Sequence, residues 1–480
     1  IDWVTRFVIQ GENLQALAQY PHTAQQLSYC KTVIKTVLER SVKQELSALC
    51  KGLSGQFIEP GPSGAPTRGR LDTLPTGRNF FSLDNRSVPS KAAWALGQQS
   101  AQALINRHLQ EHGSYPQQLG LSVWGTATMR TGGDDIAQAF ALMGVRPVWA
   151  AGSQRVVDIE VIPCMQMGRP RVDVTLRVSG FFRDAFANVM KLYDTAVQAI
   201  VNMDDPGHSN VIADNVQRRC DELIDSGVEP EQALRQASYR VFGSKPGAYG
   251  AGLQGLIDER CWSQASDLSD AYLNWGGYAY TNSAEDAVVA TDAFAHQLST
   301  LQVVVQNQDN REHDILDSDD YYQFQGGMSN AVSQLSGSDP VIYHSDHSNP
   351  AKPIIRTLKE ELNRVIRSRV LNPKWLAGMR EHGYKGAFEM TASVDYMFAY
   401  DATTNLIDDY QYKKVADTLL FDPQNQHFLQ QNNPHALEEM AERLLEATQR
   451  GLWENPEGYE DKLQDLLLSL DEQQEMGTES

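Results

Sequence analysis

The stretch Leu121-Ser122-Val123-Trp124-Gly125-Thr126 leads into Arg130-Thr131-Gly132-Gly133-Asp134-Asp135. Its apolar residues predict a short strand, and the segment Asp134–Met143 predicts a helix. A strand, a Gly-rich turn and a helix in this order are the repeating unit of α/β proteins. This stretch therefore decides the fold class.

Further apolar segments predict strands, and three of them end in polar residues. The polar runs are Ser179–Asp184, Gln306–Asp320 and His344–His347. Ligands of open α/β sheets bind outside the carboxyl ends of the strands, so these runs predict one composite site. The alternative is that they are ordinary loops, which are polar in any case. The additional predicted strands are Val156–Ile162, Val172–Val178, Leu301–Val305 and Val341–Tyr343.

The whole chain predicts an α/β plus α fold: an open, mostly parallel sheet with flanking helices, a large helical insertion and a helical C-terminal region. One helix is predicted from Pro89 to His112, because Pro favours a first turn and Gly113 ends the helix. Another is predicted over Ile354–Val370. The expected parts are a helical remainder of a truncated N-terminal region (1–58), the first part of the α/β domain (59–185), the helical insertion (186–299), the completing strands (300–350), the helical region (351–470) and a disordered tail (471–480).

The charge and composition of the chain exclude several classes of partner. With 41 Lys and Arg against 61 Asp and Glu, the formal net charge is −20. A nucleic acid is therefore not expected as the main partner, since phosphate contacts need clustered cations. No apolar run reaches the roughly 18 residues of a membrane span. The five cysteines form no CxxC pair, which favours a reducing cytoplasm.

The densest group of candidate catalytic side chains lies in Gln306–Asp320. Its carboxylates and its imidazole suit a divalent ion, and Glu312 and His313 are able to accept protons. The spacing matches no dedicated metal loop, because the Gly and the terminal Glu of an EF-hand are absent. A solvated acidic loop that caps the next helix is the alternative.

Arginines near the predicted strand ends indicate an anion site. Arg130 stands beside the Gly-rich start of a helix, where free backbone N–H groups bind anions. Asp134 and Asp135 partly oppose this interpretation, because they favour the same helix start. Arg169 and Arg171 precede the next strand, where structural pairing is the commoner role.

Motifs spread over residues 55–455 carry a resemblance to a known family. They are Pro60–Arg70, Leu74–Asn79, Trp124–Thr126, Arg130–Asp135, Gly168–Val174, Ser179–Asp184, Gly250–Gly252, Trp275–Tyr278, Asp309–Asp314, Asp317–Tyr321, Asn372–Trp375, His382–Gly386, Asp401–Thr403 and Ala441–Ala447. The chain resembles the large subunit of cobaltochelatase, the CobN family, and its relative, the large (H-type) subunit of magnesium chelatase. The family's His-Gly-Asn-Leu-Glu motif has no match here, so we expect a C-terminal fragment.

The resemblance implies the tetrapyrrole-binding subunit of an ATP-dependent cobalt chelatase. Such an enzyme inserts Co²⁺, its substrate metal, into hydrogenobyrinic acid a,c-diamide in cobalamin biosynthesis. ATP and Mg²⁺ would be used by an AAA+ ATPase subunit and its metal-site partner subunit, because this chain has no Walker A sequence. The fragment alone is expected to be inactive.

Three alternatives stay open at this point. The first is a magnesium chelatase large subunit that acts on protoporphyrin IX. The second is a non-catalytic fragment that holds the ring or docks the ATPase. The third, from another class, is a metal-dependent hydrolase.

The resemblance also implies roles for individual residues. Glu312, His313 and Asp314 are the expected catalytic residues. Asp309, Glu312 and His313 are the expected contacts of the metal that is delivered. The arginines expected to bind substrate carboxylates are Arg78, Arg130, Arg169, Arg171 and Arg183.

Overall fold

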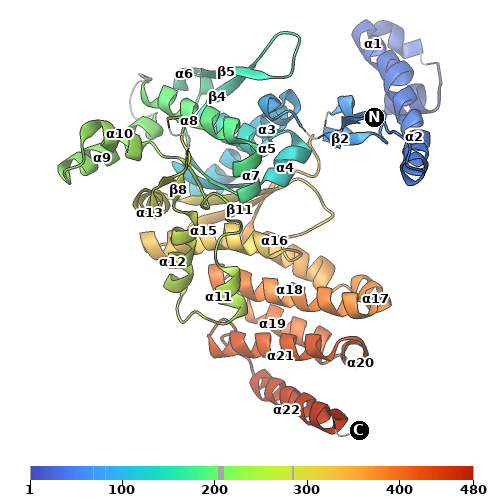
Figure 1. Cartoon of the computed structure of the whole chain (residues 1–480), viewed down its shortest axis with the longest axis vertical. Coiled ribbons are helices and arrows are strands. Elements are labelled where there is room, and N and C mark those ends of the chain that lie inside the picture. Colours follow the sequence, from blue (N-terminus) through green and yellow to red (C-terminus); the bar gives the residue numbers. More distant parts are fainter. Residues whose placement is uncertain are drawn as a thin grey trace.

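The structure is a computed structural model that describes residues 2–13, 15–68, 70–81, 83–203, 210–283 and 286–478 (Figure 1). Within these ranges, eight strands form a central sheet. They are β3 (Gln118–Val123), β6 (Asp173–Val178), β7 (Val241–Gly243), β8 (Tyr278–Ala279), β9 (Val288–Val289), β10 (Val303–Gln308), β11 (Val341–Asp346) and β12 (Ile354–Thr357).

The strand order is β12-β11-β10-β3-β6-β7-β8-β9, and the neighbours from β11 to β7 are parallel. β12 lies antiparallel at one edge, and β8 and β9 lie antiparallel at the other. The predicted α/β class with a mostly parallel sheet is therefore confirmed. The antiparallel edges were not foreseen.

Several local predictions need correction. Residues 186–299, predicted as a helical insertion, also contain β7, β8 and β9, which are too short to give a periodic pattern. The predicted strand Val156–Ile162 forms, but as β5 (Val156–Val161) it pairs with β4 (Val145–Trp149) in a separate hairpin. The predicted helix over Ile354–Val370 begins instead as strand β12. In the tail predicted to be disordered, helix α22 (Tyr459–Thr478) continues to Thr478, and residues 479–480 lie outside the described residues.

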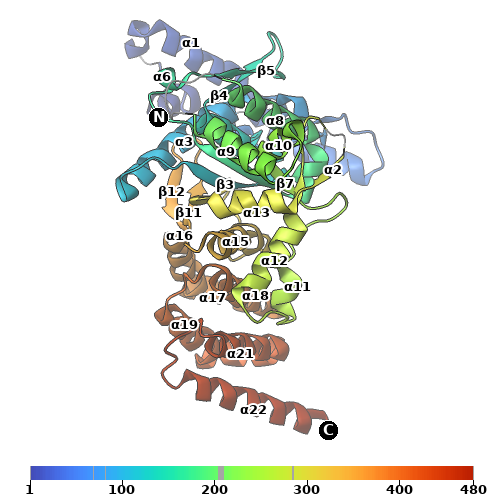
Figure 2. The ribbon, with the colours of Figure 1, turned by 90° about the vertical axis from the view of Figure 1, so that its left-hand side faces the viewer.

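Helices cover both faces of the sheet (Figures 1 and 2). Those on the face of α3 are α3 (Lys91–His112), α4 (Gly125–Thr131), α5 (Asp134–Met143), α7 (Gly180–Ala185) and α8 (Ala187–Val201), with α6 (Cys164–Met167), α9 (Val211–Asp225) and α10 (Pro230–Ala237) beside them. Those on the opposite side are α11 (Gln254–Asp258), α12 (Ala265–Gly276), α13 (Thr291–Thr300), α14 (Asp319–Tyr321), η7 (Tyr322–Gly326) and α15 (Gly327–Ser336). The predicted end of the first helix is confirmed, because Gly113 caps α3 with a φ of 71°.

The strands bury side chains on both faces, as parallel sheets do. On β10, Val303 and Val305 belong to the core under α3, α5 and α8, whereas Val304 belongs to the core on the α15 side. Gly120 on β3 is required by close packing, since a Cβ there would lie 2.4 Å from the sulfur of Met328 on α15. The sheet is thus held between two cores and its strand ends are fixed in place.

The C-terminal helices stack below the sheet (Figure 1). They are α16 (Leu358–Val365), η8 (Ile366–Val370), α17 (Pro373–Glu381), α18 (Gly383–Thr404), α19 (Asp409–Val415), η9 (Ala416–Leu420), α20 (Pro423–Asn432), α21 (Pro434–Gln449) and α22. None of the helices in the described ranges is both long and apolar enough to cross a membrane.

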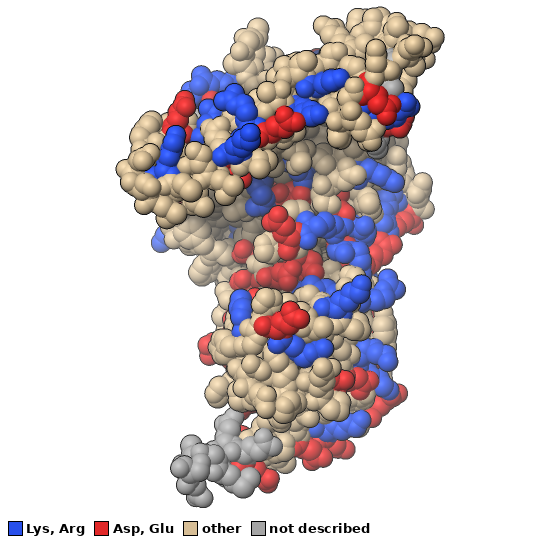
Figure 3. Space-filling model, turned by 90° about the vertical axis from the view of Figure 1, so that its right-hand side faces the viewer, with Lys and Arg blue, Asp and Glu red and all other residues tan. Residues whose placement is uncertain are grey.

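The N-terminal helices form an arm that projects from the body (Figure 1). They are η1 (Val4–Ile9), η2 (Gln15–Gln19), α1 (Pro21–Tyr29), η3 (Cys30–Ile34) and α2 (Lys35–Leu53), and short elements join them to α3: β1 (Gly61–Pro62), η4 (Pro66–Arg68), η5 (Leu71–Thr73), β2 (Asn79–Phe81) and η6 (Asn85–Ser87). In the side view of Figure 3, the surface is hollowed between the sheet-bearing upper part and the helical lower part, with charged side chains along the hollow.

Candidate functional site

The predicted polar runs lie at the carboxyl ends of β3, β6, β10 and β11, and two of them begin inside the strands, because β10 extends to Gln308 and β11 to Asp346. These strands are neighbours in the order β11-β10-β3-β6, and each pair is parallel. Their carboxyl ends therefore point the same way, as a composite site requires. The densest of the runs is the segment Asp309–Asp314 after β10, which we call the anchored loop.

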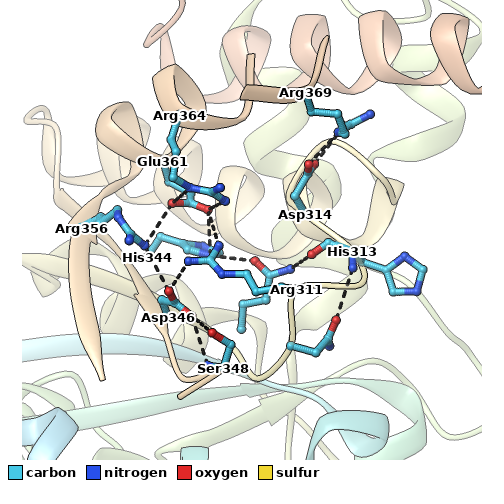
Figure 4. Close-up of polar contacts among 12 residues, drawn as sticks. Arg311, His313, Asp314, His344, Asp346, Ser348, Arg356, Glu361, Arg364 and Arg369 are labelled. Carbon is cyan, nitrogen blue, oxygen red and sulfur yellow. Dashed lines mark hydrogen bonds and ion pairs between the residues drawn. The ribbon is translucent and has the colours of Figure 1, made fainter. Parts of the chain in front are cut away.

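The anchored loop is held at both ends by arginines from other elements, and Figure 4 shows the contact of Arg369 with Asp314. Asp309 accepts hydrogen bonds from Nε and Nη2 of Arg130, both at 2.8 Å. Asp314 accepts hydrogen bonds from Nε and Nη2 of Arg369 at 2.6 and 2.9 Å. Bidentate pairs of this kind fix the geometry of both partners. The ends of the loop are therefore clamped by α4 and η8.

The middle of the anchored loop is fixed by its own polar groups. The side-chain oxygen of Asn310 accepts hydrogen bonds from the backbone N–H groups of Glu312 (3.1 Å) and His313 (3.3 Å). Arg311 pairs with Asp346 of β11 and lies 3.5 Å from the carboxylate of Glu361 on α16. The backbone conformation is thus determined at every step from Asp309 to Asp314.

The side chains of Glu312 and His313 in this loop are exposed. Neither side chain has a hydrogen bond or ion pair to the described part of the chain, and Figure 4 shows the imidazole of His313 directed away from the polar network. The loop therefore presents a carboxylate and an imidazole side by side on a fixed backbone. Together they are able to accept protons and to bind a divalent cation.

A buried polar cluster lies beside Asp309. Arg68 pairs with Asp134 at 3.0 Å, and Asn307 donates to Asp135 at 2.8 Å. Burial raises the pKa of Asp135 to about 7, although the Asn307 hydrogen bond opposes the shift. Burial also acts on Asp309, but the hydrogen bonds from Arg130 hold its pKa below the ordinary value. Asp309 therefore stays ionised near pH 7.

Glu361 forms the centre of a second cluster under the loop. Its side chain is 0% exposed and accepts from Arg364 at 2.9 Å, with Arg356 at 3.4 Å. His344 of β11 lies 4.0 Å away, and burial lowers the pKa of His344 to about 4. Burial likewise lowers the pKa of His347 to about 3. Both histidines are therefore neutral near pH 7. The negative charge of Glu361 is balanced by the arginines around it and not by a histidine.

The sequence profile described as CobN/Magnesium Chelatase matches residues 2–459. The chain belongs to the CobN/Magnesium Chelatase family. The aerobic cobaltochelatase subunit CobN of Pseudomonas aeruginosa is 59% identical over 444 residues, which are 92% of this chain and 35% of that protein. The H-type subunit of the magnesium chelatase of Chlorobaculum parvum is 32% identical over 435 residues, 90% of this chain and 33% of that protein.

A solved structure agrees with this family membership. The catalytic subunit of cobaltochelatase from Mycobacterium tuberculosis superposes with a TM-score of 0.83 at 44% identity, over 95% of this chain and 39% of that one. The chain thus spans about a third of the length of the relatives it matches, 35% in the case of the Pseudomonas protein. The family resemblance read from the sequence is confirmed.

The arginines expected to bind substrate lie in different surroundings. Arg130 is at the anchored loop, with its side chain 47% exposed. Arg169 donates to the backbone oxygens of Ala141 and Leu142, and the fully buried Arg171 to those of Met143 and Gly144, so that both join the end of α5 to the segment before β6. Of these three arginines, only Arg130 presents its guanidinium at the anchored loop.

Arg183 and Arg78 also bind backbone. Arg183 is buried, donates to the backbone oxygens of Ser244, Lys245 and Ala248, and pairs with Asp184. Arg78 donates to the backbone oxygen of Pro75 at 3.2 Å. The structure thus brings Arg130 and the anchored loop together but directs the guanidinium of Arg183 toward residues 244–248.

The three residues expected to contact the metal do not form a ready ligand set. Across the described ranges, no group of three or more His, Cys, Asp and Glu side chains is placed to hold a metal ion. Asp309 is bound by Arg130, while Glu312 and His313 are exposed. A metal on this loop would therefore need donors from its own water shell or from the tetrapyrrole.

Sequence reasoning missed the residues that hold the loop. Arg68, Arg369 and Glu361 were not singled out, although Arg68 lies in one of the family motifs. Glu361 had a readable signal, since it falls three residues after Leu358 and four before Val365, on the buried face of α16. An acid on an apolar helix face indicates a buried charge partner. Arg369 gave no comparable signal.

Proposed function

We propose that this chain is the tetrapyrrole-binding part of the large subunit of an ATP-dependent cobalt chelatase. Its reaction is the insertion of Co²⁺ into hydrogenobyrinic acid a,c-diamide in cobalamin biosynthesis. The observation that carries the proposal is the anchored loop, which holds Glu312 and His313 exposed on a backbone fixed by its neighbours. Family membership supplies the class of reaction, and the loop supplies groups that suit it.

The chemistry of insertion matches these groups. The ring must lose two inner N–H protons, and the arriving cation must exchange bound water for ring nitrogens. The carboxylate of Glu312 accepts one of these protons. An imidazole nitrogen of His313 accepts the other, or binds the cation when it arrives. Asp314 is bound to Arg369, so its role in the proposal is to position the loop.

Arg130 is the proposed contact for an acid arm of the ring. Its guanidinium is half exposed and already holds a carboxylate in bidentate geometry. A substrate carboxylate could bind Arg130 in the same geometry, either in place of Asp309 or together with it. This exchange would couple ring binding to the end of the anchored loop.

Cobalt is favoured over magnesium by the pattern of similarity. Identity is 59% to the Pseudomonas cobaltochelatase subunit and 32% to the Chlorobaculum magnesium-chelatase subunit. ATP and Mg²⁺ would be used by an AAA+ ATPase subunit and its metal-site partner subunit. The five cysteines form no disulfide with one another, which suits a reducing cytoplasm as the place of action.

A second candidate is a part of the subunit that binds the ring while the insertion chemistry lies elsewhere. Two observations favour it. The chain covers 35% of the Pseudomonas relative, and its described residues contain no group placed to hold a metal ion.

A titration tests ring binding. The eight tryptophans of the chain give the fluorescence signal, and hydrogenobyrinic acid a,c-diamide and protoporphyrin IX are the two ligands. We expect saturable quenching with the higher affinity for the corrinoid. Quenching by protoporphyrin alone would point to magnesium chelatase, and quenching by neither would refute ring binding.

Arg130→Ala is the variant for this titration. It should weaken corrinoid binding about tenfold, the cost of one charge-assisted contact. The matched control is Arg155→Ala, which removes a similarly exposed arginine paired with Asp84 at 2.9 Å. An equal loss in both variants would remove Arg130 from the proposed site.

A further inference from the structure

A second charged concavity lies away from the exposed side chains of the anchored loop, at the edge of the sheet formed by β12. It is an open groove of about 950 Å³ between α3, β12, α16, η8 and α19. Among the described residues that line it, five are cationic and one, Glu360, is acidic. The cations are Arg107, Arg356, Arg364, Arg367 and Lys414. In a chain with a net charge of −20, such a basic lining is a local exception. We call it the basic groove.

Part of the positive charge in the basic groove is not neutralised by carboxylates of the described residues. Arg107 is paired with Glu111 and Glu360. Arg367 and Lys414 are exposed, and neither has a hydrogen bond or an ion pair within the described ranges of the chain. Their charges are therefore available to a ligand, and the lining attracts anions.

The shape of the basic groove favours an extended ligand. A second hollow of about 350 Å³ shares Leu371 and Lys414 with it and is lined also by Arg380 and by two carboxylates, Asp417 and Asp422, so the excess of positive charge is confined to the basic groove itself. The concavity therefore continues from β12 past η8 toward α17 and α20. Ile354 and Tyr410, 39% and 57% exposed, add apolar surface to the cationic lining. A short polypeptide with acidic and apolar side chains fits this length and chemistry better than a compact anion.

We propose that the basic groove binds an extended, Asp- and Glu-rich segment of a partner protein. Charge complementarity supports this choice, since the rest of the chain is acidic and repels such a segment. The proposal does not depend on the chemistry of metal insertion.

Binding in the groove would reach the anchored loop through shared arginines. Arg356 and Arg364 line the groove and also hold Glu361. Glu361 in turn lies 3.5 Å from Arg311 of the anchored loop. A carboxylate of the partner competes with Glu361 for Arg356 and Arg364, so docking leaves Glu361 with fewer competing cations and strengthens its attraction to Arg311.

Fluorescence polarisation with a labelled peptide of alternating Asp and Glu tests the docking proposal on the full chain at low ionic strength. The groove variant is Arg367→Glu with Lys414→Glu, both exposed, so folding should be retained. The matched control is Arg40→Glu with Lys43→Glu on α2, which changes the net charge equally at two exposed residues. We expect saturable binding that falls about tenfold or more in the groove variant and is retained in the control.

Three results would overturn the proposal. These are the absence of saturable binding, an equal loss in both variants, and competition by inorganic pyrophosphate at concentrations below those of the peptide, which would indicate a site for small anions. Coupling has its own readout, hydrogen exchange of amides 310–314. Exchange should slow when the peptide is bound to the wild-type chain, and unchanged exchange at saturation would refute the link to the anchored loop.

Discussion

Two groups of arginines in this molecule carry the same charge but bind different partners. Arg169 and Arg171 donate to backbone oxygens at the end of α5, whereas Arg130 and Arg369 donate to carboxylates at the two ends of the anchored loop. An arginine bound to backbone oxygens is a structural tie between segments. One bound to a carboxylate near the surface is able to exchange that carboxylate for another. The comparison teaches that the partner of an arginine, rather than its place in a motif, decides its role.

The largest expected effect comes from exchanging one member of each group for methionine. Arg171→Met removes the buried donor that the backbone oxygens of Met143 and Gly144 share, although Gly144 keeps the hydrogen bond from the backbone N–H of Ile162, and should cost about 3–5 kcal/mol of unfolding free energy. Arg130→Met removes a half-exposed guanidinium from Asp309, whose side chain is 10% exposed, and should cost less, about 1–2 kcal/mol. Urea denaturation measures both. Similar losses in the two variants would end the distinction.

A second pair of variants compares a buried carboxylate with an exposed one. Glu361→Gln removes the charge that Arg364 and Arg356 share and should cost about 3 kcal/mol, because Glu361 is 0% exposed. Glu360→Gln, at the preceding position, removes a carboxylate that is 51% exposed and should cost about 1 kcal/mol or less. The two are compared by urea denaturation in the same buffer. A larger cost at Glu360 would contradict the described cluster.

The smallest expected effect is the pH dependence that Asp135 contributes. Its folded-state pKa of about 7 lies above the ordinary 3.8, so the folded state binds a proton that the unfolded state has lost. Stability from this group is therefore present at low pH and is lost as the pH rises toward 7. Between pH 5 and 7 the loss should be about 2–3 kcal/mol, at about 1.4 kcal/mol per pH unit.

Asp135→Asn tests this sign, because the amide cannot ionise. The free energy of unfolding of the variant relative to wild type should increase from pH 5 to pH 7. A constant difference over this range would show that Asp135 is ionised in the folded state throughout.

Much of the sheet was predictable because its central strands are long apolar runs. Val172–Val178 and Leu301–Val305 were found in this way, and the helix that ends at Gly113 was found from its cap. β8 and β9 are two residues each, so no periodicity exists to detect. The predicted helix over Ile354–Val370 wrongly included strand β12. The reason is that Thr357 and Glu360, which form the capping box of α16, lie inside one continuous helical pattern.

The site was predictable where its residues are adjacent in sequence. Asp309–Asp314 was singled out as a motif, and its exposed Glu312 and His313 are those proposed for the chemistry. The anchors Glu361 and Arg369 lie some fifty residues later, and a single sequence does not say which distant arginine meets which carboxylate. For the same reason Arg171 was expected at the substrate although its donors are used by backbone. The domain boundaries and the site assignments stay predictions.

The most direct test of the central claim, that the anchored loop presents Glu312 and His313 for metal insertion, is an insertion assay with the complete multi-subunit enzyme. The test variant is Glu312→Gln with His313→Ala. The matched control is Glu381→Gln with His382→Ala, because the tripeptide Arg-Glu-His occurs again at Arg380–His382, outside the loop, with both side chains exposed.

This role of the loop predicts that cobalt insertion by the loop variant falls at least about a hundredfold, the usual contribution of acid–base groups, while tetrapyrrole binding and the control are unchanged. Insertion at the wild-type rate by the loop variant would contradict it.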